Sequence, residues 1–111
     1  MPEETVNLPS LLPAEPNWWV KVVEFLQQNW ALPVPIEGGF ALLFVDDHAR
    51  VFDRLDFQDE REMCEALRRN EFEELAKTPR LQEFLRAPDI PSSARKHPNC
   101  RIYSSGRYWR I

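Results

Sequence analysis

The amino-acid sequence predicts an α+β fold built on a mainly antiparallel sheet. Two stretches, about 40–57 and 100–111, have the pattern of β-hairpins, and three others, about 17–30, 60–70 and 79–86, have the pattern of helices. Hairpin connections favour antiparallel pairing, and helices that do not alternate with single strands favour α+β over α/β. We therefore expect the helices to pack mostly on one face of the sheet.

The chain of 111 residues is near the commonest size of one domain. Residues 1–16 contain four of the ten prolines, which predicts an extended arm. Residues 17–111 then form a single domain. Apolar residues in the arm suggest that it lies against this domain or against a partner.

Residues 17–30 are predicted to form an amphipathic helix. Asn17 is a suitable N-cap, and apolar residues recur at three- and four-residue steps. These are Trp18, Trp19, Val22, Val23, Phe25, Leu26 and Trp30. The helix should end before Pro33 and Pro35, which favour extended backbone.

The first hairpin begins with an apolar run at 40–45, turns at 46–49 and continues through 50–57, where apolar and charged residues partly alternate. The apolar strand should be central and the charged strand nearer an edge. Asp59 with Glu62 then predicts a capped helix over 60–70, and Thr78 before Pro79 predicts another over 79–86. Gly106 marks the turn of the second hairpin, over 100–111.

Charge is unevenly distributed along the chain. Residues 92–111 contain five basic and no acidic residues, whereas residues 1–91 contain nine basic and all 18 acidic residues. Cations interleave with aromatic residues in this last segment, which suggests contacts to phosphates and stacking on bases. The candidate nucleic-acid-binding residues are Arg95, Lys96, Arg101, Tyr103, Arg107, Tyr108, Trp109 and Arg110. The alternative is that this segment pairs with the acidic body of its own fold.

Three tryptophans on one predicted helix suggest an exposed aromatic surface for a protein partner or for self-association. These candidate partner-binding residues are Trp18, Trp19 and Trp30. The alternative is that the arm covers them. We expect a small non-enzymatic interaction module, of the inhibitor, immunity or adaptor type, with nucleic-acid binding as the second hypothesis.

Catalytic and metal sites have weaker support in the sequence. His97 and Cys100 lie close enough to suggest a base and a thiol nucleophile, and Asp46, Asp47 and His48, with Asp53 and Asp56, contain oxygen and imidazole ligands. Neither spacing matches an established motif, so we expect no metal, no cofactor and no catalytic residues. Two cysteines, no secretory signal and no long apolar run indicate a soluble cytoplasmic protein without a membrane partner.

Overall fold

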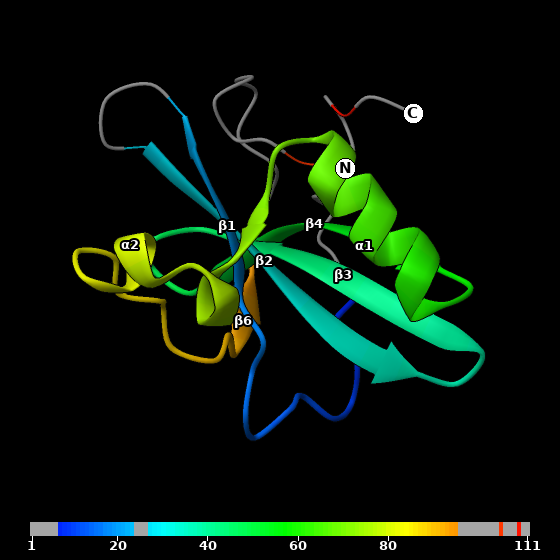
Figure 1. The fold of residues 1–111 in the computed structure, drawn as a ribbon. Helices are drawn as coiled ribbons and strands as arrows, with labels where there is room; N and C mark the ends of the chain where they lie inside the picture. The colour runs from blue at the N-terminus through cyan, green and yellow to red at the C-terminus, as the bar shows by residue number, and fades with distance from the viewer. Residues whose placement is uncertain (1–6, 24–26, 96–104, 106–108, 110–111) are drawn as a thin grey trace.

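The computed structural model describes residues 7–23, 27–95, 105 and 109. Their strands form one six-stranded sheet in the order β5-β1-β2-β3-β4-β6, antiparallel except where β6 pairs with β4 (Figure 1). The elements are β1 (Trp19–Val23), β2 (Gln27–Ile36), β3 (Gly39–Val45), β4 (Arg50–Phe57), α1 (Glu60–Arg69), β5 (Glu73–Glu74), the 3₁₀ turn η1 (Leu75–Lys77), α2 (Pro79–Gln82) and β6 (Ser93–Ala94). The predicted α+β class is confirmed.

The hairpin expected at 40–57 is present as β3 and β4, which pair in antiparallel register from Phe40↔Phe57 to Val45↔Val51. As expected, β3 is central, and β4 has only the two-residue β6 outside it. The turn between them places Ala49 at φ 58°, the left-handed conformation that commonly closes a three-residue hairpin loop.

Helix α1 begins at the predicted cap. The backbone N–H of Glu62 donates to the Asp59 carboxylate at 2.8 Å, which satisfies one of the four free donors of the first turn. The helix ends at Arg69, one residue earlier than predicted, with Asn70 as its C-cap, and Glu71 rather than Asn70 takes the left-handed conformation, at φ 68°. The N–H of Phe72 then reaches the carbonyl of Leu67 at 2.9 Å, which closes a Schellman motif.

The helix predicted over 17–30 is wrong: its described residues form β1 and β2, which pair in antiparallel register from Trp19↔Ala31 to Val23↔Gln27. Consecutive residues are buried on opposite faces of the sheet at 18–20 and again at 30–32, so apolar residues follow one another without the alternation that identifies a half-buried strand. The three- and four-residue spacing of these apolar residues matched the period of a helix by coincidence. The high content of valine and tryptophan was the correct signal.

Strand β2 includes Pro33 and Pro35, although it lies between two neighbours. Its pairing with β1 ends at Ala31, whereas its pairing with β3 continues to Ile36. The missing proline N–H groups therefore fall where β2 has no β1 neighbour, and they interrupt no ladder on that side.

The sheet is covered on both faces, which corrects the expectation that the helices pack mostly on one. The first core cluster, on one face, includes Trp18, Trp30 and Leu81 of α2, with Leu8 and Leu12 of the arm against it. The second core cluster, on the other face, includes Met63 and Leu67 of α1 (Figure 1). The sheet needs a separate cover on each side because successive strand residues point to opposite faces.

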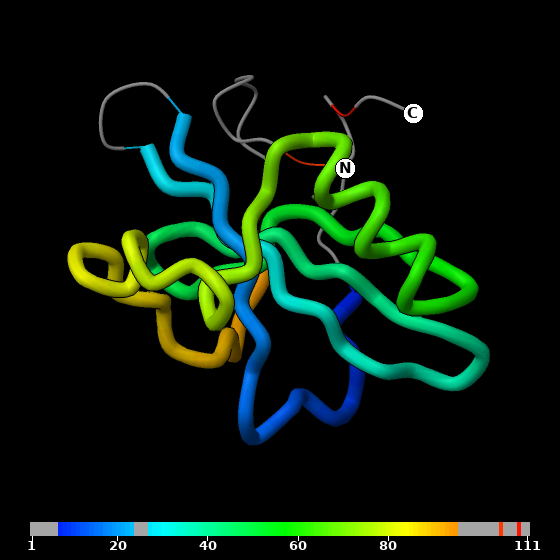
Figure 2. Tube along the Cα trace, viewed as in Figure 1, coloured from blue at the N-terminus to red at the C-terminus, as the bar shows by residue number. Residues whose placement is uncertain are grey.

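The remaining predictions are met in part. Helix α2 covers Pro79–Gln82 rather than 79–86, with Glu83 as its C-cap. The arm has no helix or strand over residues 7–16 and loops beneath the sheet (Figure 2). The hairpin predicted at 100–111 lies outside the described residues, apart from Ser105 and Trp109. Within the part of the chain that the structure describes, no helix has the length and apolar character needed to span a membrane.

Candidate binding groove beside helix α1

The three tryptophans proposed as a partner surface are buried. Trp18 is 6% exposed and Trp19 and Trp30 are each 2% exposed. Trp18 packs edge-on against Trp30 with ring centroids 5.9 Å apart in the first core cluster, whereas Trp19 belongs to the second. Strand geometry separates neighbours onto opposite faces, so the three residues form no common exposed surface.

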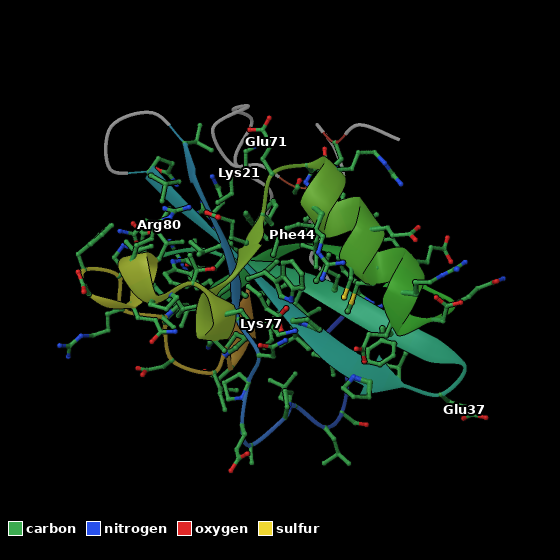
Figure 3. The ribbon with its side chains drawn as sticks, viewed as in Figure 1. Lys21, Glu37, Phe44, Glu71, Lys77 and Arg80 are labelled. Atoms are coloured by element: carbon green, nitrogen blue, oxygen red, sulfur yellow. The ribbon has the colours of Figure 1, made fainter. Side chains whose placement is uncertain are left out.

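Two of the eight candidate nucleic-acid-binding residues lie within the described part of the chain. The Arg95 guanidinium contacts the Asp46 carboxylate at 3.2 Å, and the Trp109 ring packs against Phe44 at 5.1 Å and Phe72 at 5.7 Å (Figure 3 labels Phe44). Both contacts are within the fold, and of the two only that of Arg95 is with an acidic residue. Lys96, Arg101, Tyr103, Arg107, Tyr108 and Arg110 lie outside the described residues, as do His97 and Cys100.

The Asp46 side chain has a structural role in the fold. Its carboxylate accepts hydrogen bonds from the backbone N–H groups of His48 and Arg50, at 2.9 and 3.0 Å, and from the side chains of Arg50 and Arg95. Burial by itself would raise the Asp46 pKa, but these donors outweigh it and hold the pKa below its ordinary value. Among the described residues, no group of three metal-ligating side chains converges on one point.

A groove lies where α1 leaves part of the sheet uncovered. Helix α1 packs mainly on β3 and β4, so the same face of β1 and β2 is open beside it. The groove has a volume of about 280 Å³. Its floor is formed by Trp19 and Phe40 of the sheet and by Met63 of α1, and Pro33 and Pro35 continue it along β2.

Two walls enclose this floor. Helix α1 supplies Glu60, Cys64 and Arg68, which follow one another at four-residue steps and therefore share one face of the helix. The opposite wall consists of the end of the arm together with Glu74 and Lys77 (Figure 3 labels Lys77). The arm contributes Pro13, Glu15 and Asn17.

Two charges of the second wall, those of Glu74 and Lys77, satisfy each other. The Glu74 carboxylate accepts a hydrogen bond from the Asn17 amide at 2.9 Å and lies 3.5 Å from the Lys77 ammonium. On α1, by contrast, neither Glu60 nor Arg68 forms an ion pair with another described residue. Among the described residues, α1 thus presents one acid and one base to the groove that form no ion pair, and Glu15 of the opposite wall forms none either.

Arg68 is held over the groove floor by an aromatic ring. Its guanidinium carbon lies 5.5 Å from the centroid of Trp19, within the range of a cation–π interaction. The side chain is exposed, so its N–H donors remain available. The indole N–H of Trp19 is buried and has no acceptor among residues 7–23, 27–95, 105 and 109.

Cys64 lies between the two unpaired charges and is half-buried. Burial raises the pKa of its thiol, and Glu60 and Glu74 raise it further against the opposing effect of Arg68 and Lys77. The thiol is therefore protonated near neutral pH. A neutral thiol is a small apolar surface rather than a nucleophile.

Sequence reasoning missed the groove because its parts are separated along the chain, from Pro13 to Lys77. Trp19 was named as a binding residue, but as part of a helix that does not exist. The one signal present in the sequence was the four-residue spacing of Glu60, Cys64 and Arg68 on a helix whose other face carries Met63 and Leu67. Comparison with family models, curated proteins and solved structures finds no match to this chain.

Proposed function

We propose that this protein is an interaction module and that the groove beside α1 receives a segment of a partner protein. The class of function is the one that the sequence suggested, but the binding site moves from a surface of three tryptophans to the groove around Trp19, Phe40 and Met63.

The observation that carries this proposal is that the Arg68 guanidinium lies over Trp19 and has no acidic partner among the described side chains. A guanidinium stacked on Trp19 is restrained in position, so less entropy is lost when it binds a carboxylate. Its exposed donors have no acidic partner among the described side chains. Arginine is also among the residues most enriched at the energetic centres of protein interfaces.

The composition of the groove supports a protein partner. An aromatic and thioether floor bordered by charged side chains has the anatomy of an interface, with an apolar centre and a polar rim. Trp19 and Met63 are also core residues, each 2% exposed, so the floor is rigid and does not need to be ordered on binding.

The first step of the test is photo-crosslinking in cells of the source organism. A photoreactive amino acid replaces Glu15 at the groove lip, and a control carries it at Glu83, which is exposed beyond α2 and does not line the groove. A partner at the groove is crosslinked from position 15 and not from position 83. Equal crosslinking at both positions would contradict the proposal.

The second step measures affinity for the purified partner. Arg68→Ala should weaken binding about tenfold or more, the cost of losing an arginine at the centre of an interface. Arg69→Ala is the matched control, because Arg69 is the next residue of α1, is exposed and lies outside the groove. Equal affinities of the two variants would overturn the assignment of the groove.

A further inference from the structure

We infer that the partner segment is extended and carries a basic, an apolar and an acidic side chain at alternate positions, facing Glu60, Cys64 and Arg68 in that order. This inference rests on the proposed function and adds the chemistry of the partner to it. Three features of the groove lead to it: its length, its unpaired charges and its apolar centre.

The length follows from helix geometry. Glu60 and Arg68 are eight residues apart on α1, which at 1.5 Å per residue separates them by about 12 Å along the axis. An extended chain rises about 3.3 Å per residue and presents every second side chain to the same side. Positions i and i+4 of such a chain are about 13 Å apart, which matches the two charges of α1.

The charges determine which side chains occupy these positions. Glu60 can bind a cation and Arg68 can bind a carboxylate, because both are exposed and neither forms an ion pair with a described residue, whereas Glu74 is already matched by Asn17 and Lys77. An acceptor is therefore the group that the Arg68 end of the groove can receive.

The apolar centre determines the position between them. Cys64 is a neutral thiol midway along the helix face, above the floor of Trp19, Phe40 and Met63. An apolar side chain at position i+2 of the partner would pack against Cys64 and Phe40, which are half-buried. Backbone pairing contributes little, because Pro33 and Pro35 offer no N–H to a strand laid beside β2.

The test uses acetylated and amidated pentapeptides, so that only side chains carry charge. The probe is Lys-Ser-Leu-Ser-Glu, and the comparison peptides replace Glu by Lys or Leu by Ser. Binding is followed by the amide and arginine N–H shifts of the isotope-labelled protein, which detect weak complexes. The probe should bind about tenfold more tightly than the peptide with two lysines and should shift the resonances of groove residues.

A charge reversal gives the decisive comparison. Arg68→Glu should prefer the peptide with two lysines, whereas Arg69→Glu, which places the same charge at the same end of α1, should keep the original preference. An unchanged preference in Arg68→Glu, or shifts away from the groove, would overturn the inference. If the crosslinked partner requires Arg68 but the peptides show no charge preference, the docking site stands and only the predicted chemistry of the segment is wrong.

Discussion

Asp46 shows how one carboxylate connects a turn to a distant part of the chain. The turn donates backbone N–H groups to it, and Arg95, which follows β6, reaches the same side chain. The carboxylate is 5% exposed, so removing its charge leaves donors without their acceptor. β6 pairs with the strand that leaves this turn, so Asp46 holds the parallel edge of the sheet at a second point.

We expect Asp46→Asn to lower the free energy of unfolding by about 2 kcal/mol at pH 7, the cost of weakening several hydrogen bonds to a charged group. Urea unfolding measures this decrease. Asp47→Asn, at an exposed position of the same turn, should change the free energy of unfolding little. The folded-state pKa of Asp46 lies below its ordinary value of 3.8. The contribution of the Asp46 charge to the free energy of unfolding is therefore complete above pH 3.8 and disappears as the pH falls through the lowered pKa.

The free energies of unfolding of the wild type and Asp46→Asn should converge at a pH below the lowered pKa. If their difference persists undiminished there, Asp46 stabilises the fold without its charge. The sequence indicated only a turn at this position. It gave no signal of the contact with Arg95, because residues 46 and 95 are brought together by the parallel pairing of β4 and β6.

At the scale of single elements, α1 ends on an unusual residue. Glu71 adopts φ 68°, where a side chain is strained and glycine is not. It occupies the position of the Schellman motif that most often contains glycine. The side chain itself is exposed (Figure 3), so the strain is not offset by packing.

Glu71→Gly should therefore raise the free energy of unfolding by about 1 kcal/mol, which thermal or urea unfolding would detect. Glu71→Ala is the control: it removes the same carboxylate but keeps a Cβ at positive φ, so we expect no such gain. A gain of the same size from alanine would attribute the effect to charge rather than to backbone conformation.

The elements differ in how well the sequence predicted them. Residues 40–70 carry local signals, namely a turn, a cap and a clear change of period, and their hairpin and helix were placed correctly. The described residues of 17–36 have no such signals because consecutive residues of β1 and β2 belong to different core clusters, so tertiary contacts decide their structure. Helix propensity and spacing are weak priors in that situation.

At the scale of the whole molecule, the arm completes the covering of the sheet. Leu8 and Leu12 pack against the first core cluster, and the last part of the arm continues into one wall of the groove on the opposite face. The arm thus passes from one side of the sheet to the other beneath β2 and β3 (Figure 2). Its packing against the domain is one of the two alternatives that the sequence left open.

Leu12→Ala should lower the free energy of unfolding by about 1–2 kcal/mol, less than a fully buried leucine because the side chain is half-buried. Leu11→Ala is its neighbour and control: Leu11 is 82% exposed, so we expect a change within about 0.5 kcal/mol. Denaturant unfolding of both variants compares them directly. Equal effects would mean that the arm does not stabilise the domain through Leu12.

The groove draws on the arm, β1, β2, α1 and η1, so it exists only when these segments are assembled. Any partner that occupies it binds the folded chain and has no equivalent site on the unfolded one. Mass action then couples the two equilibria: at a free partner concentration 100 times the Kd, the folded state gains about 2.7 kcal/mol. The abundance of the partner would thereby raise the equilibrium fraction of folded chain.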